Sequence, residues 1–229
     1  MRHLILTLCL FGAACGPSRY VDAAADSTLQ GELLVMWLDD GGVAEDRKGR
    51  FVFVPSPAKP LRLVRQDVDF PVIEPGRMQT DGGSIPAAAQ VFRGLSPWSY
   101  APAYILHDYL FLARACARTG QAQDAPLPGI AEMPFETTGD ILAETIKALQ
   151  REGRVSKDDL APLAISSAVN GSISRSKWDG ERACTPLSDI DNLRIDAVFS
   201  PAAAGRLRGM NEESGEDLPK AEIVGAVSF

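Results

Sequence analysis

The chain has 229 residues, of which 45% are hydrophobic, and its formal net charge is −7. This length allows one good hydrophobic core. An acidic chain without basic clusters argues against nucleic acid as a partner, because phosphate backbones attract positively charged proteins. The same charge argues against simple electrostatic adsorption to an anionic membrane.

Residues 1–15 have the parts of an export signal. Arg2 and His3 form a short basic region, residues 4–11 are apolar, and residues 12–14 are small. The apolar run is too short to span a bilayer. The sequence Ala-Ala-Cys-Gly around Cys15 resembles a bacterial lipoprotein processing site. The resemblance implies lipidation of Cys15 and a place on the periplasmic side of the cell envelope, at the outer membrane. The alternatives are an ordinary secreted protein and a buried N-terminal element.

The mature chain changes in character from strands to helices. Residues 16–30 are expected to form a tether. Short apolar runs separated by Gly and Pro predict antiparallel strands at 33–38, 51–54, 61–64 and 70–73. Helices are predicted over 99–118, 138–151 and 156–177. We therefore expect a single α+β domain over 31–186, with a small N-terminal antiparallel β part followed by a three-helix part. Residues 187–229 have little periodic hydrophobicity, and we expect an irregular tail there.

Export changes the cysteine count. Cys9 would leave with the signal and Cys15 would carry lipid, so Cys116 and Cys184 remain. In an oxidising compartment these two can form a disulfide that ties the 99–118 helix to a later segment. Two separate buried thiols are the alternative. The chain has no Cys/His cluster of the kind that binds structural zinc.

The pair His107–Asp108 lies in the 99–118 helix, which is apolar nearly all round. Buried ionisable groups need partners, so His107 is either a satisfied core histidine or part of a site. Because His3 lies in the signal, His107 is the only histidine of the mature chain. A multi-histidine metal site and a zinc protease of the HExxH type are therefore excluded.

Three motifs together resemble a family of uncharacterised proteins from phages and bacteria. They are TDGGSIP at 80–86, HDYL at 107–110, and the segment TGDILAETIKALQREG at 138–153, whose predicted helix opens near an aspartate. The resemblance covers residues 70–178, about half of the chain. It implies no settled activity.

A more distant resemblance is to the secretory phospholipases A2, which place a His-Asp pair on a central helix beneath a glycine-rich loop. It implies that His107 activates water and that Asp140 orients the imidazole. Asp108 would bind calcium, the one cofactor implied, together with the loop of Asp81, Gly82 and Gly83. Asp140 also fits a solvent-facing position in the first turn of its helix.

Two classes of function remain open. The first is a calcium-dependent esterase of the cell envelope with a His107–Asp140 dyad. The second is a phage-related envelope protein, held to the membrane by its lipid anchor, in which Asp81, His107, Asp108 and Asp140 form a buried polar network of structural or binding role. An open apolar groove beside His107 would favour the enzyme, and a closed environment would favour the network.

Overall fold

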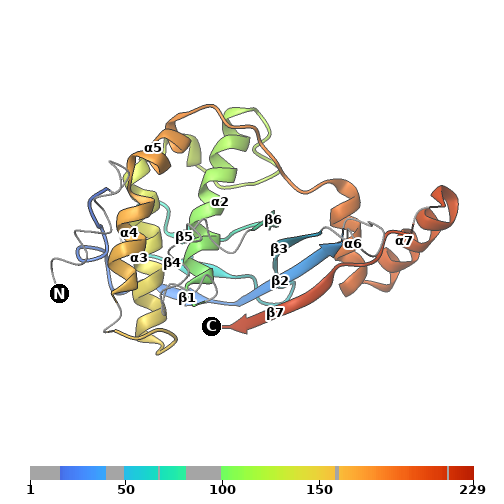
Figure 1. Cartoon of the computed structure of the whole chain (residues 1–229), viewed down its shortest axis with the longest axis horizontal. Helices are drawn as coiled ribbons and strands as arrows, with labels where there is room; N and C mark the ends of the chain where they lie inside the picture. Colours follow the sequence, from blue (N-terminus) through green and yellow to red (C-terminus); the bar gives the residue numbers. More distant parts are fainter. Residues whose placement is uncertain (1–15, 40–48, 67, 81–98, 158–159, 216) are drawn as a thin grey trace.

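The computed structural model describes residues 16–39, 49–66, 68–80, 99–157, 160–215 and 217–229. The predicted α+β class is confirmed, because antiparallel strands come first and helices follow (Figure 1). Within the described residues there are two small sheets and six α-helices.

The larger sheet has the strand order β6-β3-β2-β7. At its centre, β2 (Glu32–Asp39) pairs antiparallel with β3 (Gly49–Pro55), from Leu33 opposite Pro55 to Asp39 opposite Gly49. The edges are β6 (Met78–Gln79) and β7 (Glu222–Ser228). The central pair matches the strands predicted at 33–38 and 51–54.

The smaller sheet has the order β1-β4-β5, with strands Thr28–Gln30, Arg62–Val64 and Val72–Ile73. The last two match the strands predicted at 61–64 and 70–73. Strand β1 falls within the stretch that was predicted to be a tether.

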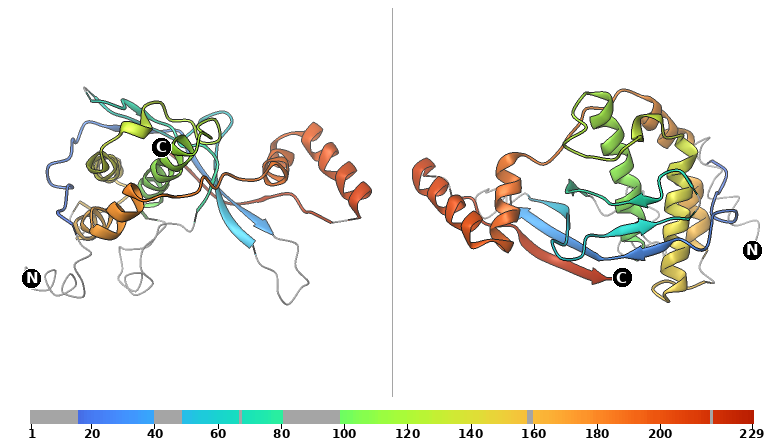
Figure 2. Two further views of the ribbon diagram at one scale, coloured as in Figure 1. Left: turned by 90° about the horizontal axis from the view of Figure 1, so that it is seen from above. Right: turned by 180° about the vertical axis from the view of Figure 1, so that it is seen from behind.

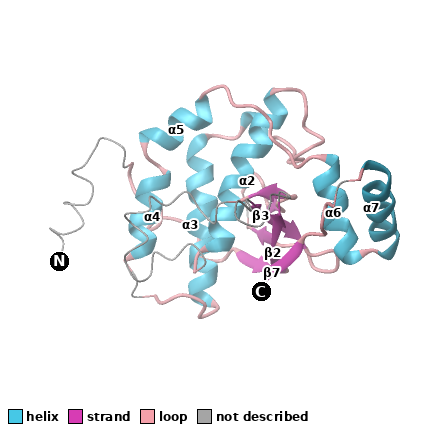
Figure 3. Ribbon diagram, turned by 45° about the vertical axis from the view of Figure 1, so that its right-hand side comes forward, coloured by secondary structure: helices cyan, strands magenta, loops and turns pink. Residues whose placement is uncertain are grey.

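The centre of the larger sheet is buried on both faces. Leu33 and Val35 belong to the main core, which also holds α2 (Ala101–Arg118). Leu34, Met36 and Leu38 point the other way and pack with Ile195 of α6 (Asp189–Phe199). Figure 3 shows the strands between the group α2–α5 and the pair α6–α7. Because both faces of β2 are packed against other elements, its sequence is a continuous apolar run.

The main helical group contains α2, α3 (Phe135–Arg151), α4 (Ala161–Val169) and α5 (Ser172–Asp179), with a short 3₁₀ helix, Ile130–Glu132, between α2 and α3. The prediction of one helix over 156–177 is wrong, because the chain turns at Asn170 and Gly171. The backbone of Gly171 is extended, with φ −77° and ψ 172°. The Asn170 side chain also packs so tightly on Gly139 of α3 that a Cβ there would lie 2.1 Å from Oδ1 of Asn170.

The prediction of an irregular tail after residue 186 is also wrong. This part of the chain forms α6, α7 (Pro201–Ser214) and the edge strand β7. Ser188 and Ser200 cap the two helices by accepting hydrogen bonds from the backbone N–H groups of Asp191 and Ala203. The buried contact between the helices consists mostly of alanines, which produce a weak periodic signal. Figure 2 shows α6 and α7 reaching away from the other helices.

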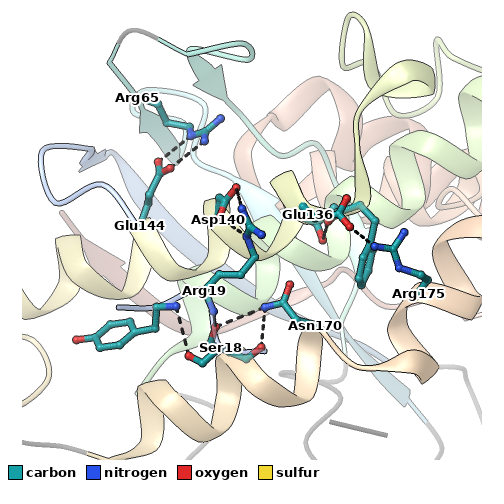
Figure 4. Close-up of polar contacts among 12 residues, drawn as sticks. Ser18, Arg19, Arg65, Glu136, Asp140, Glu144, Asn170 and Arg175 are labelled. Carbon is teal, nitrogen blue, oxygen red and sulfur yellow. Dashed lines mark hydrogen bonds and ion pairs between the residues drawn. The ribbon is translucent and has the colours of Figure 1, made fainter. Parts of the chain in front are cut away.

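An ion pair between Arg65 and Glu144 joins the smaller sheet to α3. Nε and Nη2 of Arg65 donate to the two carboxylate oxygens of Glu144 at 2.7 and 2.8 Å (Figure 4). Both side chains are only 4% exposed. The hydroxyl of Ser27 donates a third hydrogen bond to Glu144 at 2.7 Å. Removing either charged partner therefore leaves a buried charge without its counter-ion.

We expect Arg65→Met to lower the free energy of unfolding by about 3–5 kcal/mol, because the Glu144 carboxylate would stay buried without a cation. Urea unfolding measures the change. The double variant Arg65→Met/Glu144→Met should recover most of the loss, since no charge is then buried. A single variant as stable as the wild type would contradict this account of the pair.

Candidate functional site

His107 lies in the core. Its residue exposure is 6%, and its ring packs against Phe111 with the ring centroids 5.0 Å apart. Nδ1 lies 3.6 Å from Oδ1 of Asp108, which is long for a hydrogen bond. Among the described residues, Nε2 has no hydrogen-bond partner. The surroundings of His107 are thus those of a core side chain.

The predicted dyad is not formed, because Asp140 is bound by Arg19. Nε and Nη2 of Arg19 donate to the two carboxylate oxygens of Asp140, the second at 2.9 Å (Figure 4). The prediction that Asp140 orients His107 is therefore wrong in this structure. Asp140 also does not simply face solvent, since its side chain is 27% exposed.

The calcium ligands predicted in the glycine-rich loop cannot be placed. Asp81, Gly82 and Gly83 lie outside the described residues, as does Cys15. Within the described ranges, no three His, Cys, Asp or Glu side chains gather closely enough to hold a metal ion. Of the four predicted metal ligands, only Asp108 is described, and it lies beside His107.

Helix α3 carries three acidic residues at four-residue intervals, and each binds an arginine from a different part of the chain. Glu136 pairs with Arg175 of α5, Asp140 with Arg19, and Glu144 with Arg65 (Figure 4). Residues four apart lie near one face of a helix, so this spacing forms a row. Of these three acids only Asp140 was predicted to have a role, although their regular spacing is visible in the sequence.

The segment 16–27 runs along this helix and is fixed to it at several points. The Tyr20 hydroxyl donates to Oε1 of Gln150, and Lys147 donates to the carbonyl oxygens of Val21 and Ala23. Farther along, Arg151 donates to the carbonyl oxygens of Ala25 and Ser27. The cationic side chains of α3 thus bind backbone carbonyls of the segment, while Asp140 and Glu144 bind its side chains.

Helix α4 holds the beginning of the same segment. The Gly16 N–H donates to the Ser167 carbonyl at 2.9 Å, and the Arg19 N–H donates to Oγ of Ser166 at 3.0 Å. A Cβ on Gly16 would lie 1.9 Å from the Asn170 carbonyl oxygen, so only glycine permits this approach. The prediction of a tether over 16–30 is wrong. The segment belongs to the folded domain.

The predicted disulfide is confirmed. Cys116, near the end of α2, is bonded to Cys184, which follows α5, with Cα atoms 4.5 Å apart. Paired cysteines persist in oxidising compartments such as the bacterial periplasm. The bond ties the end of α2 to the segment that leads from α5 to α6.

No family model matches the chain, and neither a curated protein nor a solved structure does. None of the described helices is long and apolar enough to cross a membrane.

Two tyrosines of α2 allow a test of how α2 is buried. Tyr104 is 4% exposed, and its hydroxyl has no hydrogen-bond partner among the described residues. The Tyr109 hydroxyl, in contrast, donates to the Pro126 carbonyl at 3.0 Å. Burial raises the pKa of both phenols above the ordinary value, and that of Tyr109 to about 12.

At neutral pH we expect Tyr104→Phe to leave the free energy of unfolding unchanged or to raise it by about 1 kcal/mol, because an unpaired buried hydroxyl is removed. Tyr109→Phe should lower it by about 1 kcal/mol, because a made hydrogen bond is lost. Above a pH of about 10, the unfolded phenols ionise while the folded ones keep their protons, so the wild type loses stability. Each variant should lose less stability than the wild type over this pH range. Urea unfolding between neutral and alkaline pH measures this, and an alkaline loss equal to that of the wild type would contradict it.

Proposed function

We propose that the chain is an exported bacterial envelope protein, anchored to the membrane by lipid on Cys15, whose folded domain has a structural or binding role. The observation that carries the proposal is the disulfide between Cys116 and Cys184. A cytoplasmic protein would keep these thiols reduced, and export is what residues 1–15 predict independently. We place the protein on the periplasmic side, at the outer membrane, following the resemblance around Cys15.

The proposed anchor is next to a residue that the structure describes. A processed lipoprotein begins at its lipidated cysteine, and Gly16 is the next residue. The hydrogen bond from Gly16 to Ser167 means that the residue next to the proposed anchor is held by α4.

The polar network that this proposal includes differs from the one expected at first. The buried Arg65–Glu144 pair and the Arg19–Asp140 pair fix the fold, whereas His107 and Asp108 form a separate contact on α2. The calcium-dependent esterase is the weaker proposal. Arg19 occupies both oxygens of the carboxylate that would orient His107, and His107 is itself buried.

We expect Cys15→Ser to release the protein from the membrane fraction or to leave it unprocessed, because no acyl group can be attached. Cell fractionation and intact mass measurement test this, with the mature wild type heavier than its peptide mass by the acyl groups. Cys9→Ser is the matched control, since it removes a cysteine that the proposed processing discards. If Cys15→Ser protein fractionates and weighs the same as the wild type, the anchor is wrong.

A further inference from the structure

Cationic side chains line a surface depression where the end of α2 meets the end of α5. Two aromatic side chains line it as well, Phe111 and Trp178, which pack edge to face with their ring centroids 5.0 Å apart. The cations are Arg114 and Arg118 of α2, Lys177 of α5, and Arg182, which follows α5. In a chain whose net charge is −7, this is a local gathering of positive charge.

The disulfide holds the two parts of the chain that form this depression. Cys116 comes two residues before Arg118, and Cys184 comes two residues after Arg182. The Cα atoms of the two cysteines are 4.5 Å apart. Nη1 of Arg118 also donates to the Asp179 carbonyl oxygen at 3.2 Å, which joins α2 directly to the end of α5. The approach of the two arginines is therefore fixed by the fold.

None of the four cations forms an ion pair with a carboxylate of the described residues. Nη1 of Arg114 donates only to backbone carbonyls, those of residues 130, 131 and 133. Nη1 of Arg118 donates only to those of residues 178 and 179. Arg182 has a ring contact, with its guanidinium carbon 6.0 Å from the centroid of Phe111. The arginines that bind α3, in contrast, each have a carboxylate partner.

The charges in the depression repel one another. Arg114 and Arg118 are four residues apart on one helix, a spacing at which like charges are destabilising. Burial and then the charge of Arg118 lower the pKa of Arg114, and these two effects outweigh the attraction of Asp179 and Glu132. The nearby carboxylates therefore do not compensate the positive charge at Arg114.

The negative ends of the helices account for only part of this cluster. Arg118 and Lys177 lie in the last turns of α2 and α5, where a cation is favourable. Arg182 lies beyond the end of α5 and belongs to no helix. The side chains of these three residues are exposed, so their N–H groups can reach a ligand that comes from solvent.

We propose that this depression binds a phosphate group through Arg118, Lys177 and Arg182. A phosphate monoester carries about two negative charges and three acceptor oxygens, which match several cations better than the single charge of a carboxylate does. Guanidinium groups donate to phosphate oxygens in a forked geometry. Arg114 is held by carbonyls and adds positive charge from its place beside Trp178. The inference rests on the proposed function in giving its binding role a ligand class, but it does not require the lipid anchor.

Titration of the full chain with inorganic phosphate at constant ionic strength tests the inference, with NMR signals of the arginine Nε–H groups as the readout. We expect the signals of Arg118 and Arg182 to shift to saturation. Arg118→Gln and Arg182→Gln should each weaken phosphate binding about tenfold, because a charge-assisted hydrogen bond is lost. Arg208→Gln is the matched control, since it changes an exposed arginine of α7, at the other end of the molecule (Figure 1). It should leave the dissociation constant unchanged.

Two further anions identify the ligand. Glycerol phosphate that binds at least as tightly as inorganic phosphate would support a phosphate ester as the ligand, and binding of inorganic phosphate alone would support the free anion. Acetate that binds as tightly as phosphate would overturn the inference, and so would phosphate shifts no larger than those caused by sodium chloride. An Arg118→Gln chain that melts at a lower temperature but keeps the wild-type phosphate affinity would also overturn it, because the cation would then serve only the helix end.

The two proposals can fail separately. A chain that binds phosphate but carries no acyl group would keep the inference and contradict the anchor. An acylated chain whose arginine signals do not respond to phosphate would keep the anchor and contradict the inference.

Discussion

Three carboxylates at four-residue intervals along α3 fix the positions of three segments that are distant in the sequence. The strength of the pairs follows their burial. Arg65–Glu144 is shielded from water, so breaking it costs several kcal/mol, while Glu136–Arg175 is nearly half exposed and contributes little. Arg19–Asp140 is intermediate in exposure, and its main effect is to fix the position of the N-terminal segment on α3. The smaller sheet, the N-terminal segment and α5 are thereby all located relative to one helix.

The N-terminal segment is bound to the helices along its length. The residues that were predicted to form a tether are bound to α3 and α4 from Gly16 to Ser27. The segment is therefore part of the folded domain and does not act as a free tether.

The parts of the fold that sequence reasoning found are those with a strong local pattern. Strands β2 and β3 are long apolar runs, and α2 is apolar nearly all round with Pro102 in its first turn. The disulfide followed from counting cysteines under one assumption about export. The prediction failed at α6 and α7, whose contact is built from alanines, and at β7, an exposed edge strand that takes its place from pairing with β2. None of these features has a clear periodic signal.

The prediction of the candidate site was wrong for a related physical reason. Asp140 was predicted to orient His107, but its partner is Arg19, and nothing local in the sequence links Asp140 to Arg19. A motif resemblance supplied His107 as the partner instead. The Arg19–Asp140 pair depends on tertiary packing, because Arg19 belongs to a segment that has no periodic pattern of its own and is held against α3 and α4.

The most direct test of this account is amide hydrogen exchange on the mature protein at Gly16 and Arg19. The Gly16 N–H donates to the Ser167 carbonyl, and the Arg19 N–H donates to the Ser166 hydroxyl. A segment that belongs to the folded domain should exchange both amides much more slowly than an unstructured chain. Exchange of both at the rate of an unstructured peptide would mean that the segment is a free tether, and the account of an N-terminal segment bound to α3 and α4 would be wrong.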